Sequence, residues 1–164
     1  MVREAKIKRS KKARVKIKAN PVISVNKGLL RLMDTKKKIV YLFLSDKPVK
    51  YRYKRKSKIV YIGKTKRNGE RPFESLKNKS AKLMQSKEIK PRVKRIDVIY
   101  FEARGKQGAD IVDKFERACL HEFRSYYGRL PYGNSKGNKL LELTNEDEFF
   151  DLGAIKEDLQ FISK

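Results

Sequence analysis

Residues 58–71 of this chain read Lys-Ile-Val-Tyr-Ile-Gly-Lys-Thr-Lys-Arg-Asn-Gly-Glu-Arg, and this stretch decides the expected fold. Its first half is β-branched and aromatic with an alternating pattern, which is typical of a half-buried β-strand. The Asn68-Gly69 dipeptide then indicates a turn before a helix that begins near Arg71. Gly63, two residues after Tyr61, allows another backbone or a phosphate to come close. The stretch fits a phosphate site, and it also fits an ordinary strand end.

The composition indicates a nucleic-acid partner. The 164 residues include 43 Lys and Arg against 19 Asp and Glu, a formal net charge of +24. A chain of this length is expected to form one domain, and such a charge excess repels itself unless a polyanion binds it. No apolar run is long enough to span a bilayer, so we expect no membrane association.

Single residues exclude other classes of site. Cys119 is the only cysteine and His121 the only histidine, which excludes a disulfide and a His/Cys zinc site within one chain. The charged N-terminus has no apolar segment behind it, so we expect no signal peptide and a cytoplasmic, intracellular location.

Charge divides the chain into three expected parts. Residues 1–20 hold nine Lys or Arg and one acid, which predicts a mobile basic arm that either follows DNA phosphates or is simply solvated. Residues 142–164 hold seven acids and two lysines, and we expect this helical segment to pack on the core and face away from the polyanion. Residues 21–141 would then form the core.

Two strands are expected to form a hairpin. Residues 39–44, Ile-Val-Tyr-Leu-Phe-Leu, are apolar throughout and predict a buried central strand. Residues 47–58, dense in Lys and Arg, would join it to the Tyr61 strand as a long cationic loop. Tyr51 and Tyr53 in this loop fit stacking on bases or arginine, and a solvated loop fits equally well.

The rest of the chain predicts a basic amphipathic helix, a third strand, a long helix with one apolar face and one or two short helices, over residues 72–85, 93–101, 110–127 and 144–163. Gly128 is expected to end the long helix, and Gly153 to break the last segment. The expected fold class is α/β of the α+β type, a small three-stranded antiparallel sheet flanked by helices.

Glu116 projects from the apolar side of the predicted 110–127 helix, with Cys119, Leu120 and Phe123 three, four and seven residues later. Burial of an unpaired carboxylate is expensive, which leaves either an ion pair with Lys or Arg or a metal site at the edge of the core. Glu122 is the rival on the same helix.

Five elements occur in the order seen in the GIY-YIG endonuclease family, which the chain resembles over residues 37–140: Ile39-Val40-Tyr41, Tyr61-Ile62-Gly63, Arg71, a helical glutamate and Asn134 in a Pro-x-x-Asn turn. Two features depart from the family pattern. Ser75 stands where many relatives carry a histidine or tyrosine, and the spacing from Tyr41 to Tyr61 is longer than usual.

The resemblance implies a metal-dependent DNA endonuclease that hydrolyses phosphodiester bonds. Tyr41 and Tyr61 resemble the catalytic tyrosines, one of which would activate water. Arg71 resembles the arginine that steadies the scissile phosphate and the leaving group, and Asn134 resembles the terminal active-site asparagine. Residues expected on the phosphate side are Gly63, Lys64, Lys66 and Arg67.

The resemblance also implies a single metal-binding carboxylate, with Mg²⁺ or Mn²⁺ as the cofactor. Glu116 is the first choice, because the apolar residues that follow it resemble the family helix. Glu122 stays as the alternative, because its spacing to Asn134 is that of the shorter family members. A free tyrosine has a pKa of about 10, so we expect cations such as Lys64 and Arg71 to favour phenolate.

Partners and role follow from the same reasoning. We expect double-stranded DNA as the substrate, and a homodimer or sequential nicks if both strands are cut. A prokaryotic or viral-type restriction or phage enzyme is favoured over a homing or repair enzyme, because no DNA-reading domain is appended. The alternative function is a non-catalytic nucleic-acid-binding protein, ribosome-associated or architectural, which the charge alone supports equally well.

Overall fold

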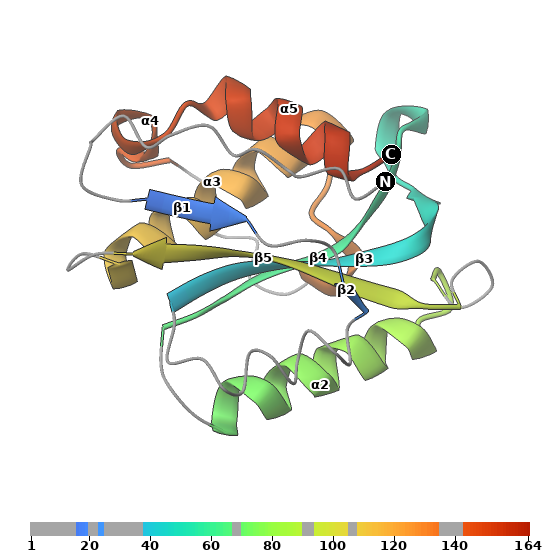
Figure 1. Cartoon of the computed structure of the whole chain (residues 1–164). Helices are drawn as coiled ribbons and strands as arrows, with labels where there is room; N and C mark the ends of the chain where they lie inside the picture. The colour runs from blue at the N-terminus through green and yellow to red at the C-terminus, as the bar shows by residue number, and fades with distance from the viewer. Residues whose placement is uncertain are drawn as a thin grey trace.

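A computed structural model of the chain describes residues 16–19, 23–24, 38–66, 70–89, 94–104, 108–134 and 143–164. An antiparallel sheet lies at its centre (Figure 1), with three long strands, β3 (Lys38–Lys50), β4 (Lys56–Thr65) and β5 (Ile96–Arg104). Two short strands, β1 (Lys16–Ala19) and β2 (Ile23–Ser24), pair with β5, so the sheet order is β1-β5-β3-β4. The predicted α+β class with three main antiparallel strands is confirmed.

The N-terminal boundary differs from the prediction. Residues Lys16–Ala19 fall within the predicted arm, yet they form β1 by antiparallel pairing with residues 101–104 of β5. The edge of β5 offers unpaired backbone groups, and pairing with a passing segment satisfies them. The predicted core over residues 21–141 therefore begins too late, and the arm over residues 1–15 lies outside the described residues.

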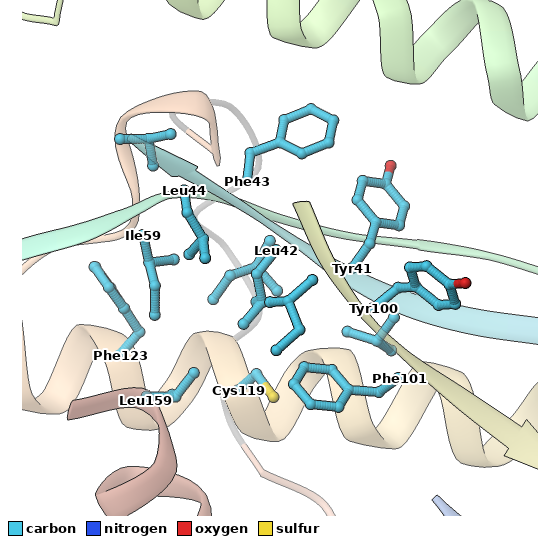
Figure 2. Close-up of a cluster of buried hydrophobic side chains, with 14 of the residues drawn as sticks. Tyr41, Leu42, Phe43, Leu44, Ile59, Tyr100, Phe101, Cys119, Phe123 and Leu159 are labelled. Carbon is cyan, nitrogen blue, oxygen red and sulfur yellow. The ribbon is translucent and has the colours of Figure 1, made fainter. Parts of the chain in front are cut away.

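Helices cover both faces of the sheet. One face is covered by α2 (Glu70–Gln85), and the other by α3 (Gly108–Tyr127) with α5 (Leu152–Ile162) beside it (Figure 1). Figure 2 shows the consequence for β3, where Leu42 and Leu44 point toward α3 while Phe43 points away from it. Residues 39–44 of β3 are buried on both faces of the sheet, which explains why this stretch is apolar throughout.

The predicted long cationic loop is wrong. β3 continues to Lys50 and β4 begins at Lys56, with register shifts between Phe43 and Val49, so only residues 51–55 connect the strands. The two tyrosines of the loop also separate. Tyr51 is buried and its hydroxyl donates to the Ile59 carbonyl oxygen at 2.8 Å, whereas Tyr53 is exposed within the 3₁₀ turn η1 (Arg52–Lys54).

The ends of the later helices are set by backbone and side-chain hydrogen bonds. Gly128 follows α3 with φ of 73°, a left-handed conformation that ends the helix as predicted. Gly153 is not the break, because it lies within the first turn of α5. The chain turns at Asp151 instead, whose Oδ1 accepts from the Ala154 backbone N–H at 3.1 Å and caps the helix.

The C-terminal helix α5 packs on the rest of the described chain. Phe150, Ile155 and Leu159 are buried, and α5 lies against α3 and β4. The short helix α4 (Glu146–Phe149) precedes it, and a 3₁₀ turn, η2 (Tyr132–Asn134), follows α3. Among the described helices, none combines the length and the apolar character needed to cross a membrane.

Candidate active site

The two predicted tyrosines lie side by side on neighbouring strands. Tyr41 of β3 pairs with Gly63 of β4, and Phe43 pairs with Tyr61, so the two phenols are diagonal neighbours on one face of the sheet. Their ring centroids are 5.8 Å apart, and the Phe43 ring lies within 5.5 Å of both. Tyr41 is buried and Tyr61 is partly exposed, so Tyr61 is the more accessible phenol.

Steric crowding explains why residue 63 is a glycine. A Cβ placed there would lie 2.6 Å from the Tyr41 hydroxyl oxygen and 2.7 Å from Cε1 of Tyr61. Real side chains do not approach so closely, so any other residue would displace the phenols. The glycine of the Tyr-Ile-Gly triplet therefore makes room for the tyrosine pair.

The prediction that nearby cations favour a tyrosine phenolate is wrong for the protein without bound substrate. Burial raises the pKa of Tyr41 well above its ordinary value, and its interactions with Tyr61 and the charge of Glu116 raise it further. Burial also raises the pKa of Tyr61, although a hydrogen bond from Tyr41 opposes that rise. Both phenols are neutral near neutral pH, because desolvation and the charge of Glu116 disfavour the phenolate.

Glu116 lies in a cluster of alternating charges between α3 and β4. The Lys64 ammonium is 2.7 Å from Oε2 of Glu116 and 2.7 Å from Oδ1 of Asp113, and Lys66 pairs with the other Asp113 oxygen. Asp113 was not predicted as a site residue. It lies three residues before Glu116, a spacing that places both acids on one side of the helix, and this signal was present in the sequence.

The pKa values of these groups follow from their pairing. Burial raises the pKa of Glu116, and Lys64 only partly offsets it. Burial alone would raise the pKa of Asp113, but hydrogen bonds from Lys64 and Lys66 hold it below its ordinary value. The same two carboxylates raise the pKa of Lys64 against the effect of burial, so Lys64 stays charged.

The rival acid points elsewhere. Glu122 is 9 % exposed, and its Oε1 lies 3.0 Å from Nδ1 of His121. The charge of Glu116, by contrast, raises the pKa of both tyrosines. Of the two candidate acids, Glu116 is therefore the one associated with the tyrosine pair.

Asn134 binds the open edge of β4. Its Oδ1 accepts from the Ile62 N–H at 2.9 Å, and its Nδ2 donates to the Ile62 carbonyl oxygen at 2.7 Å. In the described sheet β4 is the last strand, so these two backbone groups have no strand partner on that side. The amide of Asn134 takes the place of a strand and fixes η2 beside Tyr61.

A pocket of about 380 Å³ opens next to this edge. It is lined by Tyr61, Lys79, Lys82, Leu83, Ser86, Tyr132, Gly133 and Asn134. The Lys79 ammonium lies 5.4 Å from the centroid of the Tyr61 ring. The sequence predicted a basic amphipathic helix here, but it did not show which lysines would face Tyr61, because that depends on how α2 lies against η2.

Other predicted residues are placed only in part. Arg71 belongs to the first turn of α2, as predicted, but its side chain and that of Ser75 lie outside the described part of the chain. Arg67 also lies outside it. Lys66 is described and binds Asp113 rather than facing the pocket.

The donor set fits a Mg²⁺ ion that keeps most of its water. Glu116 is 18 % exposed and Asp113 23 % exposed, so both carboxylates are accessible from solvent at the strand edge. Mg²⁺ commonly takes one or two carboxylates together with waters and phosphate oxygens. No group of three or more His, Cys, Asp or Glu side chains comes together within the described residues, so a cage made wholly of protein ligands is not formed there.

Comparison of the chain with protein-family models, with curated proteins and with solved structures found no match. The fold and the site thus define an α+β protein that carries a tyrosine pair, two paired acids and a cationic pocket at one sheet edge. The resemblance to the GIY-YIG family rests on the order of these residues in the sequence.

Proposed function

We propose that the protein is a divalent-metal-dependent DNA endonuclease of GIY-YIG type that hydrolyses phosphodiester bonds at the open edge of β4. One observation carries the proposal: two adjacent phenols line or adjoin a cationic pocket, and the charge of a carboxylate on α3 raises the pKa of both, although these groups come from segments far apart in the sequence. A structural role alone gives no reason for this combination.

The phenols act as hydrogen-bond donors in the proposed mechanism. Tyr61 is the more accessible one and lines the pocket, so it would contact the attacking water or a phosphate oxygen. Tyr41 is buried beside it and would position the Tyr61 hydroxyl through their mutual hydrogen bond. A neutral phenol orients water and stabilises charge without removing a proton, so the attacking water would lose its proton to solvent once a bound divalent ion lowers the pKa of that water.

Cations supply the binding energy for the phosphate chain. Lys79 and Lys82 face the pocket from α2, and each can pair with a phosphate oxygen without breaking an ion pair described here. Arg71, in the first turn of the same helix, is proposed to neutralise the scissile phosphate and the leaving oxygen. Such charge stabilisation is often the largest single contribution to phosphodiester hydrolysis.

Glu116, with Asp113 beside it, would hold Mg²⁺ or Mn²⁺. When bound, the ion would neutralise charge on the phosphate and lower the pKa of a bound water. In the structure Lys64 pairs with both carboxylates. Its ammonium would have to move away from Glu116 for a cation to bind there, and it would then be free to contact a phosphate.

The test compares the two acids of α3 with the same substitution. We expect Glu116→Gln to lower plasmid cleavage in Mg²⁺ or Mn²⁺ by about 10²-fold or more, while DNA affinity stays within about twofold. Glu122→Gln is the matched control on the same helix, and it should retain cleavage. Cleavage is followed on agarose gels, and DNA affinity by fluorescence anisotropy.

Two outcomes would reject the nuclease. Wild-type protein that leaves plasmid intact with both metals rejects it directly. Equal cleavage by Glu116→Gln and wild type rejects the site, even if some cleavage is observed. Sequencing of the DNA ends then separates site-specific restriction, which gives fixed ends, from phage-type degradation, which gives ragged ends.

The alternative function is a non-catalytic nucleic-acid binder. The observation in its favour is that both Asp113 and Glu116 are paired with lysines, as in a structural ion-pair cluster. For that function Glu116→Gln would alter stability alone. The substrate proposed for the nuclease is double-stranded DNA, and cutting of both strands would need two copies of the chain or two successive nicks.

A further inference from the structure

The tip of the β3–β4 hairpin presents an aromatic ring to solvent. Tyr53 is 70 % exposed, and among the described residues Phe161, at 38 %, is the other large apolar side chain with substantial exposure. The neighbours of Tyr53, Arg52 and Lys54, are both exposed. Burial of such a ring against a partner would be favourable.

The backbone places this ring at the apex at a conformational cost. Tyr53 has φ 56° and ψ 29°, Lys54 has φ 57°, and the Arg55 N–H donates to the Arg52 carbonyl oxygen at 3.1 Å. Tight hairpin turns with positive φ at both central residues usually hold Asn and Gly there. Non-glycine residues in this region are strained, and such strain often occurs at functional sites.

Several contacts hold the tip in place. A Cβ on Gly128 would lie 2.5 Å from the Tyr53 ring and 2.8 Å from Cβ of Arg52, so the tip rests directly on the end of α3. The Arg55 guanidinium lies 3.8 Å from the centroid of the Tyr126 ring and donates to the Tyr126 carbonyl oxygen. A ring held this way loses little conformational freedom on binding.

The positive charge around the tip indicates which class of partner it would bind. Residues 50–58 contain six Lys or Arg and no Asp or Glu. An aromatic ring surrounded by cations is the combination that proteins use to bind single-stranded nucleic acid, with the ring stacked on a base and the cations on phosphates. In an intact duplex the faces of the bases are covered by stacking, so the ring needs an unpaired base.

The tip is also connected to the candidate site. Tyr51, at the base of the tip, packs against Tyr132 with ring centroids 5.0 Å apart, and Tyr132 lines the pocket beside Tyr61. We propose that the tip, residues Arg52–Lys54, binds an unpaired nucleobase of DNA by stacking on Tyr53, so that the protein prefers DNA that carries single-stranded bases. This inference rests on the DNA partner of the proposed function and not on cleavage.

The test measures binding in EDTA, so that cleavage plays no part. Two fluorescein-labelled probes are used, a single-stranded oligonucleotide and a duplex of the same sequence. Tyr53→Asn removes the ring but tolerates positive φ, so the turn should be kept. We expect its Kd for the single strand to rise about tenfold and its Kd for the duplex to change less than about twofold.

Control variants separate stacking from charge and from folding. Tyr53→Phe keeps the ring and should bind both probes within about twofold of wild type. Lys54→Gln should weaken both probes and lower the slope of log Kd against log salt by about one. Phe161→Gln removes the other exposed ring and should leave both affinities unchanged.

Three results would overturn the inference. The first is that Tyr53→Asn binds the single strand as tightly as wild type. The second is that Tyr53→Asn loses equal affinity for the single strand and the duplex. The third is that Tyr53→Phe loses as much affinity for the single strand as Tyr53→Asn. If wild type does not cleave DNA but Tyr53→Asn selectively weakens single-strand binding, the nuclease proposal is rejected and base stacking at the tip is supported. If wild type cleaves DNA but Tyr53→Asn has no such effect, only the proposal for the tip is rejected.

Discussion

At position 63 even a methyl group would clash with the tyrosine pair. The Cβ of Gly63→Ala would lie 2.6 Å from the Tyr41 hydroxyl oxygen and 2.7 Å from the Tyr61 ring, in a buried part of the sheet. We expect the substitution to lower the free energy of unfolding by about 1–3 kcal/mol, as overpacking commonly does. Urea denaturation measures this loss, and cleavage should fall by at least about tenfold as the phenols shift.

Gly153→Ala is the matched control for that experiment. Its Cβ would meet Oδ1 of Asp151 at 3.3 Å and no other neighbour as close, and Gly153 lies in a helix. We expect a change within about 1 kcal/mol and full activity. Equal stability and activity in both alanine variants would contradict the steric role of Gly63.

At the scale of elements, Asn134 joins η2 to the edge of β4. Asn134→Ala removes two hydrogen bonds to Ile62 and should lower the free energy of unfolding by about 1–3 kcal/mol. Asn134→Asp should be worse above the carboxyl pKa, because its second oxygen would face the Ile62 carbonyl oxygen. Urea denaturation at neutral pH ranks the two variants. A smaller loss of stability in Asn134→Asp than in Asn134→Ala would contradict the two hydrogen bonds from Asn134 to Ile62.

Glu146 anchors the C-terminal segment to α3. Its Oε1 lies 2.6 Å from the Arg117 guanidinium, and its Oε2 accepts from the backbone N–H groups of Thr144 and Asn145. Burial would raise the pKa of Glu146, but these donors outweigh it, and the pKa lies below its ordinary value of 4.5. The negative charge is therefore stabilised in the folded state.

The sign of the pH effect follows from that shift. A carboxyl whose folded pKa is depressed contributes stability above its unfolded value of 4.5, and this contribution is lost as pH falls through the folded pKa. We expect wild type to lose more stability than Glu146→Gln between neutral pH and about pH 3. Urea denaturation along this range tests it, and parallel losses would contradict the prediction.

For the whole molecule, the proposed nuclease would meet DNA at the pocket beside the β4 edge, where α2 contributes lysines. Lys79 and Lys82 face the pocket, whereas Lys114 on α3 is already bound to Asn145 Oδ1 at 2.6 Å. We expect the double variant Lys79→Gln, Lys82→Gln to lower the slope of log Kd against log salt by about two, as each lost phosphate contact lowers it by about one.

Lys114→Gln changes the net charge by one but should leave this slope nearly unchanged. Duplex binding is measured by anisotropy over a series of salt concentrations. Equal slopes for wild type and the double variant would mean that DNA approaches another face, and the site at the β4 edge would lose its expected phosphate contacts.

Much of the fold could be predicted from local sequence. The apolar run of residues 39–44 predicted a central strand because both of its faces are covered, and Gly128 predicted the end of α3 because only glycine adopts its positive φ without strain. The hairpin loop could not be predicted, since Tyr51 is buried against aromatic rings at positions 123, 127 and 132, which are distant in sequence.

The sequence by itself determined the net charge, the main strands and helices, and the order of Tyr41, Tyr61 and the helical glutamate. Only the tertiary structure decided that Glu116 rather than Glu122 acts on the phenols, that Asn134 binds Ile62, and that Tyr53 is exposed while Tyr51 is buried. The physical reason is that periodicity follows from neighbours along the chain, whereas desolvation and pairing depend on which distant segments meet.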